Sequence, residues 1–347
     1  MSQRRLFLDV GIGETRGVVT LDGRPERLLI DRGETLPAQA LGARLVARVR
    51  KVERAQAMAF LDMGQGPDGV LNLRAEMERV NEGQALEVEI RGEGRADKGA
   101  QMRLIGPAEG APRVLEAAPT LAEQLRALAS KAEVVTGGAA RRVADEAQDE
   151  ALQTEFAIPG GGTLAVERTR ALTAVDVDMG ARTGAEAKRA ARMANLAALA
   201  TVARVLRLKG LGGLVVIDLA GRGHDGPALL AAARTAFAAD NPGVALGPIS
   251  RFGTLELTIP RRSRPAVEQL ADAAGVPTAQ TEALALIRAL QREAAADGGA
   301  RLEATASEAV ARAAAPYLEG LIARVGARLT LRGEPGRADT IYSVRRL

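Results

Sequence analysis

The stretch ALTAVDVDMG, residues 171–180, places two aspartates inside an otherwise apolar run. Its pattern predicts a β-strand, on which Asp176 and Asp178 point to the same face because they lie two positions apart. A second strand is predicted in LGGLVVIDLAG, and its near-continuous apolar run indicates burial on both faces. Asp218 ends that strand, where open α/β sheets present their ligand-binding groups. These three carboxylates are the first candidates for a functional site.

Composition narrows the chemistry that the chain can perform. Its 347 residues suffice for two or three domains, and 47 Lys and Arg against 43 Asp and Glu permit an anionic partner without requiring one. Cysteine is absent, which excludes disulfides, thiolate nucleophiles and cysteine zinc sites. His224 is the one histidine, so the sequence offers almost no material for a His-based acid/base pair, a catalytic triad or a multi-histidine metal cluster. Carboxylates remain as the candidate reactive groups.

Two interpretations of the aspartates stay open on spacing alone. In the first, a shared divalent metal ion offsets the free-energy cost of bringing several negative carboxylates together. Oxygen ligands favour Mg²⁺, with Mn²⁺ as the alternative. Such an ion supports phosphodiester hydrolysis without a protein nucleophile. The other interpretation is that the aspartates form strand-end turns or ion pairs with nearby arginines.

The pattern in the rest of the sequence predicts a mixture of helices and strands. An opening meander of three strands precedes five short strands over 38–106, which suit a barrel of the OB type. A loosely packed linker is expected at 263–280. From 281 to 347 the order is helix, strand, helix, strand, strand, with the last two strands expected to form a hairpin.

A long helix is predicted between the two aspartate-bearing strands. Thr183 with Glu186 three residues later forms a capping box at its start, and Gly210 supplies the stop.

Three segments in this order and spacing resemble the catalytic core of the ribonuclease E/G family: ALTAVDVDMG, NLAALATVARVLRLKGLGGLVVIDL and ISRFGTLELT. VRKVERAQAMAFLDMGQGPDGVLNL is similar to the RNA-binding OB-type domain of that family. Residues 281–325 resemble its small domain, so the likeness extends over roughly three quarters of the chain.

The resemblance implies a mixed α+β fold. An OB-type barrel is inserted in a truncated RNase H-like subdomain, and a DNase I-like α/β nuclease core and a small C-terminal α/β domain follow. The expected bounds are 1–37 with 107–165 for the RNase H-like part, 38–106 for the barrel, 166–262 for the core, 263–280 for the linker and 281–347 for the small domain.

The resemblance also implies roles for individual residues. Asp176 and Asp218 match the two aspartates that hold the catalytic Mg²⁺. Asp178 stands where the family usually has an asparagine that helps to place the scissile phosphate, and we count it among the catalytic candidates.

Three further residues are expected to contact RNA. Phe60 matches an aromatic on which a base stacks, although a barrel-core phenylalanine is the alternative, and Val70 replaces a second aromatic of the family. Lys98 matches a lysine near the RNA path. In SRFG, Arg251 is interpreted as a phosphate contact and Phe252 as packing.

Some features of the family are missing. Its zinc-link cysteines should follow SRFGTLELT, so no zinc and no zinc-mediated dimer are expected, and a homo-oligomer without that link stays open. Too little chain separates barrel and core for the 5′-end sensor. Recognition of a 5′-monophosphate should therefore be weak or absent.

The leading hypothesis is a Mg²⁺-dependent endoribonuclease that hydrolyses single-stranded RNA in processing or decay. The alternative is an RNA-binding protein on the same scaffold with little or no catalysis, and cleavage of DNA is a third option. No signal-peptide hydrophobic region and no membrane-length apolar run occur in the sequence, so a cytoplasmic location is expected.

Overall fold

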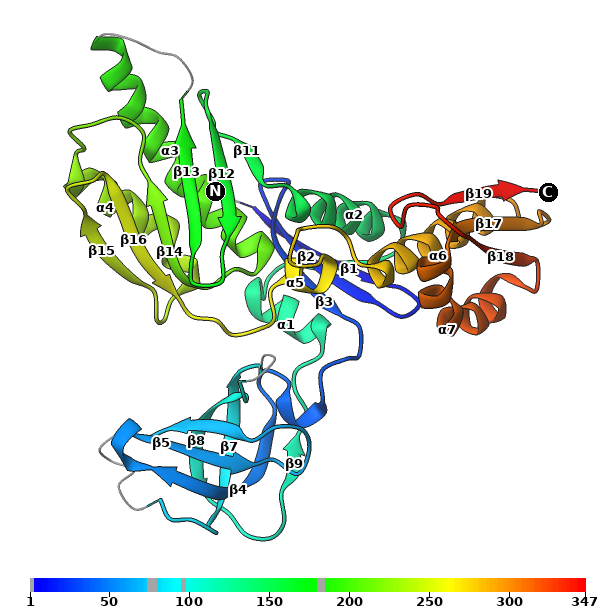
Figure 1. Cartoon of the computed structure of the whole chain (residues 1–347), viewed down its shortest axis with the longest axis horizontal. Coiled ribbons are helices and arrows are strands. Elements are labelled where there is room, and N and C mark those ends of the chain that lie inside the picture. Colours follow the sequence, from blue (N-terminus) through cyan, green and yellow to red (C-terminus); the bar gives the residue numbers. More distant parts are fainter. Residues whose placement is uncertain (1–2, 74–79, 95–97, 180–184) are drawn as a thin grey trace. The chain divides into compact units, whose positions relative to one another are not determined.

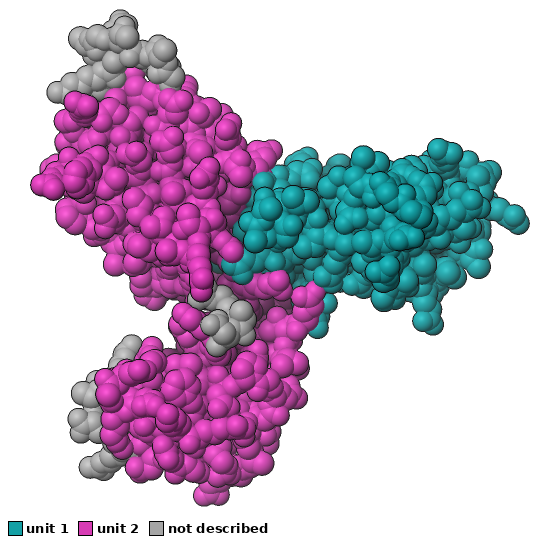
Figure 2. Space-filling model, in the orientation of Figure 1, with its two compact units in different colours: residues 1–33, 128–152, 266–347 teal, residues 34–127, 153–265 magenta. Residues whose placement is uncertain are grey.

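A computed structural model describes residues 3–73, 80–94, 98–179 and 185–347 (Figure 1). The chain divides into two compact units, which Figure 2 distinguishes by colour. Unit 1 comprises Met1–Gly33, Leu128–Leu152 and Ala266–Leu347. Unit 2 comprises Glu34–Ala127 and Gln153–Pro265.

Unit 2 contains the expected barrel. Its strands are β4 (Arg44–Glu53), β5 (Met58–Asp62), β6 (Gly69–Asn72), β7 (Ala85–Gly92) and β8 (Gln101–Pro107). They follow the order β5-β6-β8-β7-β4, and an additional β4–β5 pairing closes the sheet. β6 and β8 are parallel and the other pairs are antiparallel. A five-stranded closed barrel of OB type is therefore present.

Alternation along the strands fills the barrel. Leu45, Ala47 and Val49 of β4 are at most 1% exposed, as are Ala59 and Leu61 of β5. Arg48 and Phe60, which lie between buried residues of β4 and β5, are not buried, as the two-residue period of a strand requires. Short 3-10 turns lie at Pro37–Gln39 and Arg54–Gln56, β9 (Arg113–Glu116) adds an edge strand on β4, and α1 (Leu121–Leu128) follows.

The second part of unit 2 is a mixed sheet backed by helices. Its strand order is β11-β12-β13-β14-β16-β15. The elements are β11 (Glu155–Ala157), β12 (Thr163–Arg168), β13 (Thr173–Asp178), α3 (Ala185–Lys209), β14 (Gly213–Asp218), α4 (Gly226–Ala236), a 3-10 turn (Ala238–Asp240), β15 (Ala245–Ile249) and β16 (Thr254–Ile259). β13 and β14 pair in parallel, and α3 connects them.

Among the described residues, helices pack on one face of this sheet. Val175 and Val177 of β13 and Val215 and Ile217 of β14 are at most 4% exposed, and α3 and α4 supply the helical layer. Leu214 on the other face is 39% exposed. The prediction that β14 is buried on both faces is therefore wrong, because Leu214 and Asp218 on its second face are exposed.

The long helix ends as predicted. α3 stops at Lys209, and Gly210 follows with φ of 70°, donating its N–H to the carbonyl of Arg207. A positive φ at this position favours glycine. The predicted capping box involves Thr183, which lies outside the described residues.

Unit 1 contains two small sheets and their helices. The first sheet has the order β10-β1-β2-β3, and α2 packs on it. The second has the order β18-β17-β19 and is accompanied by α6 and α7. The bounds are β1 (Arg4–Val10), β2 (Thr15–Leu21), β3 (Arg24–Asp31), β10 (Val134–Val135), α2 (Gly138–Leu152), α5 (Ala266–Leu270), α6 (Ala279–Ala296), β17 (Leu302–Ser307), α7 (Glu308–Val325), β18 (Leu329–Glu334) and β19 (Ser343–Arg346).

Two expectations for the C-terminal region need correction. β18 and β19 do not form a hairpin, because β17 lies between them and pairs with β18 in parallel and with β19 antiparallel. This places the buried β17 at the centre of its sheet. Residues 263–280 are packed in part: they contain α5, whose Ala266 and Leu270 are at most 3% exposed, whereas residues 272–276 are exposed.

A buried ionic network joins three segments of unit 1. Arg16 on β2 is 1% exposed, and its guanidinium lies 2.6 Å from Asp9 and 2.8 Å from Asp145 of α2. Glu14 accepts from Arg32 and from Arg288 of α6, each at 2.8 Å. These contacts tie the N-terminal strands to helices more than a hundred residues away in the sequence.

Replacing Arg16 with Met should destabilise unit 1 by about 3–5 kcal/mol, because buried carboxylates lose their cation while side-chain volume is retained. Arg346→Met is the matched control: it removes a half-exposed pair with Glu293 in the same unit and should cost about 1 kcal/mol or less. Urea unfolding followed by circular dichroism measures both. Equal unfolding midpoints for the two variants would contradict this reading of the network.

Candidate metal and RNA site

Asp176 and Asp218 are direct neighbours on adjacent strands. The parallel register of β13 and β14 pairs Asp176 with Asp218, and both side chains lie on the exposed face of the sheet. Neighbouring strands are about 4.8 Å apart, so two carboxylates emerge side by side. Their mutual repulsion favours a cation at this position.

The carboxylate pair belongs to a row that crosses four strands. Asp176 is paired with Ala165 of β12 on one side, and Asp218 with Thr254 of β16 on the other. The row thus has small or hydroxyl side chains at its ends and acidic side chains at its centre.

Asp178 lies one step beyond this row. It is the last residue of β13, on the same exposed face as Asp176, and pairs with Thr163 of β12. The pairing of β13 with β14 ends at Asp176 and Asp218, two residues before Asp178. The structure therefore brings the three predicted aspartates to one corner of the sheet, two of them in direct register.

A buried asparagine that the sequence reasoning missed fixes the chain after Asp218. Asn195 of α3 is 1% exposed, its Nδ2 donates to the carbonyl of Ala220 at 3.0 Å, and its Oδ1 accepts from the Ala220 N–H at 2.9 Å. These two hydrogen bonds hold the backbone two residues beyond Asp218. The signal in the sequence is an amide side chain placed among the alanines and leucines of a long helix.

The turn between β15 and β16 lies beside the carboxylate row. The N–H of Leu219 donates to the carbonyl of Gly253 at 3.2 Å, and Thr254 pairs with Asp218. Arg251 in this turn is exposed, with its guanidinium 4.7 Å from the ring centre of Phe252. The expectation that Phe252 serves as packing is wrong, since its side chain is 76% exposed.

Two further arginines and the histidine make local structural contacts in this part of the chain. Arg261 Nε donates to the carbonyl of Gly212 at 2.7 Å, and Arg262 donates to that of Pro242 at 2.8 Å. His224 lies against Gly253, and a Cβ added to Gly253 would stand 2.9 Å from the His224 Nε2. This nitrogen is buried and has no hydrogen-bond partner among the residues that the structure describes. A side chain at Gly253 would therefore collide with the imidazole.

On the barrel, Phe60 faces outward. It is half-buried, whereas Ala59 and Leu61 on either side are fully buried, which excludes the barrel-core alternative. Its register partners are Lys51 on β4 and Val70 on β6. These strands and the loop between the fourth and fifth strands are the usual nucleic-acid surface of an OB-type barrel.

Lys98 lies in that loop, between β7 and β8, with an exposed side chain. Gly99 beside it approaches the carbonyl of Asp68 so closely that a Cβ there would stand 1.7 Å from the oxygen. Close packing of the loop backbone thus fixes the chain next to Lys98. Phe60, Lys51 and Lys98 combine an apolar ring with two cations on one barrel.

The donor chemistry at the sheet corner suits a hard cation. Within residues 3–73, 80–94, 98–179 and 185–347, no group of three His, Cys, Asp or Glu side chains is placed to hold a metal. Mg²⁺ does not need such a cage, because it retains several waters and binds through one or two carboxylates plus substrate phosphates. Two carboxylates in register fit this mode.

Comparison with known protein families agrees with the resemblance of the three sequence segments. The model of the ribonuclease E/G family matches residues 114–262, which contain α1, α2 and the whole mixed sheet of unit 2. The match covers less than half of the chain and leaves out the barrel strands β4–β8 and the C-terminal region. No curated protein matches. Among the helices that the structure describes, none combines the length and apolarity that a membrane span requires.

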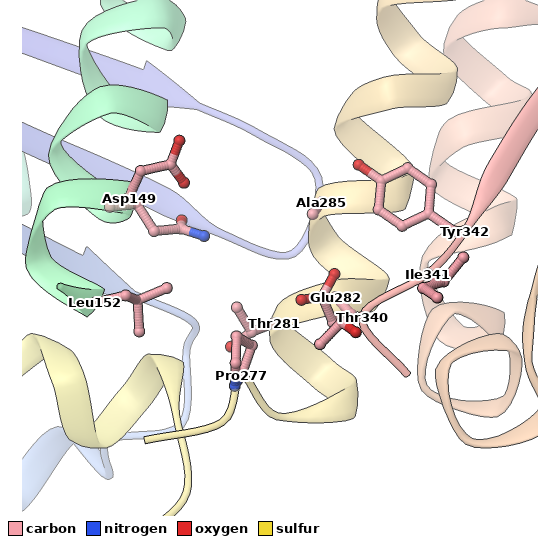
Figure 3. A pocket seen from close by; sticks show the side chains of 10 residues that line it. Asp149, Leu152, Pro277, Thr281, Glu282, Ala285, Thr340, Ile341 and Tyr342 are labelled. Carbon is pink, nitrogen blue, oxygen red and sulfur yellow. The ribbon is translucent and has the colours of Figure 1, made fainter. Parts of the chain in front are cut away.

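Unit 1 contains a pocket of its own, about 510 Å³ in volume (Figure 3). Asp149 of α2, Glu282 of α6 and Tyr342 line it. Burial raises the pKa of the Asp149 carboxyl, and Asp145 raises it further. Burial likewise raises the pKa of Glu282, against the opposing effect of Arg288. The pocket thus disfavours the ionised form of two acids.

Replacing Glu282 with Gln should stabilise the protein near neutral pH. A carboxyl with a raised folded-state pKa stays protonated after the unfolded chain has lost its proton, so stability falls as pH rises from about 4.3 through the folded pKa. The variant should match the parent at about pH 4 and exceed it at higher pH.

Unfolding in urea across this range measures the effect, with Glu319→Gln on the exposed surface of α7 as the control. A constant difference between Glu282→Gln and the parent at every pH would show that burial of charge is not the cause.

Proposed function

We propose that this chain, a member of the ribonuclease E/G family, is a divalent-metal-dependent endoribonuclease that hydrolyses phosphodiester bonds of single-stranded RNA. The observation that carries the proposal is the register pairing of Asp176 with Asp218 on the exposed face of the sheet. The family match includes both residues.

Asp176 and Asp218 would hold Mg²⁺, with Mn²⁺ as the alternative ion. Their side chains are oxygen donors from adjacent strands, in the number that Mg²⁺ uses when it also binds phosphate. When bound, the ion supplies activation of water and stabilisation of negative charge at a phosphodiester. This chemistry needs neither a cysteine nor a histidine.

The chain's own residues provide position and charge around that pair. Asn195 fixes the backbone that follows Asp218, and Arg251 presents a cation to an RNA phosphate from the neighbouring turn. Asp178 replaces the asparagine usual in the family and adds a third negative charge at the corner. We propose that it contributes to placing the scissile phosphate or its water.

The barrel supplies the preference for single strands. Phe60 offers an outward ring for a base, and base stacking requires bases that are not paired within a duplex. Lys98 offers a cation to the backbone from the adjacent loop. Binding by stacking and phosphate contacts should weaken steeply with salt.

The alternative is an RNA-binding protein with little or no catalysis. The additional charge of Asp178 and the absent 5′-end sensor favour it, since both depart from the family pattern. Retained RNA binding without metal-dependent cleavage is its expected behaviour. Competition between RNA and DNA oligomers of the same sequence separates both options from a deoxyribonuclease, because the two RNA-directed options predict a preference for RNA.

Cleavage of a labelled single-stranded RNA by the full chain tests the proposal. Cleavage should require Mg²⁺ and stop in EDTA, and Asp176→Asn or Asp218→Asn should each lower the rate by at least about 100-fold, because each removes half of the proposed protein ligand set. Glu167→Gln on the neighbouring strand β12 is the control and should keep the parental rate. Cleavage by Asp218→Asn at the parental rate would refute the assignment.

A further inference from the structure

Phe252 is an exposed aromatic in a chain that otherwise buries its phenylalanines. Of the five, Phe7, Phe156 and Phe237 are at most 5% exposed and Phe60 is half-buried, whereas Phe252 is 76% exposed. A large apolar ring held in water gains free energy from any partner that covers it. The position of Phe252 indicates which partner that is.

The turn that presents Phe252 is held by several hydrogen bonds. Ser250 Oγ accepts from the N–H groups of Phe252 and Thr254, each at 3.2 Å, and lies 2.7 Å from the hydroxyl of Thr254. The Ser250 N–H donates to the Thr254 carbonyl at 2.9 Å. Gly253 has φ of 89° and packs on His224. The ring therefore projects from a defined turn.

This turn adjoins the proposed cleavage site. Thr254 is the register partner of Asp218, and Phe252 is two residues away from Thr254. With about 3.8 Å between successive Cα atoms and about 4.8 Å between strands, the Cα of Phe252 is at most about 12 Å from that of Asp218. An RNA strand whose phosphate lies at Asp218 thus has a neighbouring nucleotide within reach of the ring.

Arg251 adds the matching charge. Its guanidinium lies 4.7 Å from the centre of the Phe252 ring, a cation–π contact on an exposed turn. An aromatic ring with an adjoining arginine is the combination that holds a nucleobase and its phosphate in single-strand binding sites. A lipid or protein surface would use the ring but has no comparable need for a single paired cation.

We propose that Phe252 is a nucleobase-stacking site, which takes a base next to the scissile phosphate of single-stranded RNA while Arg251 contacts the backbone. The proposal rests on the function proposed above and adds a specificity-determining residue to it. Stacking on Phe252 orders the RNA strand close to Asp218, and the barrel surface around Phe60 binds another part of the same RNA strand.

Binding of a short fluorescent single-stranded RNA to the full chain in EDTA tests this without cleavage. Phe252→Ala and Phe252→Leu should both weaken binding by about 5- to 150-fold, since leucine keeps apolar volume but not the ring, and Phe252→Tyr should retain it. Met193→Ala is the control: it removes a side chain that is 59% exposed on α3 and should leave affinity unchanged.

Salt dependence separates stacking from charge. Phe252→Ala should keep the parental slope of log affinity against log salt, whereas Arg251→Ala should reduce that slope by about 1. In a further experiment, an abasic nucleotide is placed at each position of the RNA in turn. At one position it should weaken binding to the parent protein but leave binding to Phe252→Ala unchanged. Parental affinity for Phe252→Ala, or equal abasic effects in both proteins, would overturn the proposal.

The two proposals fail in different ways. Loss of RNA affinity in Phe252→Ala, together with no Mg²⁺-dependent cleavage by the parent, supports the stacking site and refutes the nuclease. Cleavage by the parent together with unchanged RNA affinity in Phe252→Ala refutes the stacking site alone.

Discussion

The parallel pairing of β13 with β14 is the constraint on which the proposed site depends. Buried valines and isoleucine at alternate positions fix which face of each strand turns to the helices, so Asp176 and Asp218 must share the other face. A shift of one residue in register would turn an aspartate into the apolar layer. The repulsive carboxylate pair is thus maintained by packing on the opposite side of the sheet.

Other parts of unit 2 support this corner. α3 makes the parallel connection and contributes Asn195, whose two hydrogen bonds fix the chain after β14. β16 contributes Thr254 beside Asp218, and the turn before it carries Arg251 and Phe252. The same elements that close the hydrophobic core therefore position every group proposed to act on RNA at this edge, while the OB-type barrel offers a separate stacking surface.

Periodicity in the sequence was sufficient for the barrel, for the strands bearing Asp176 and Asp218, and for the end of α3 at Gly210. It did not predict the position of β17 between β18 and β19, because strand order depends on contacts distant in sequence. The role of Asn195 is not predictable from periodicity, because its hydrogen-bond partner is backbone 25 residues away. The sequence does not reveal the exposure of Phe252, because hydrophobicity alone does not distinguish a core ring from one displayed on a turn.

Binding of Mn²⁺ to the full chain, followed by electron paramagnetic resonance in the absence of RNA, tests the central claim most directly. Asp176→Asn and Asp218→Asn should each weaken binding at least about tenfold, and the double variant should lose less than the sum of the two effects, because both side chains serve one ion. Mg²⁺ should displace the Mn²⁺. Parental Mn²⁺ affinity in both single variants would contradict the account.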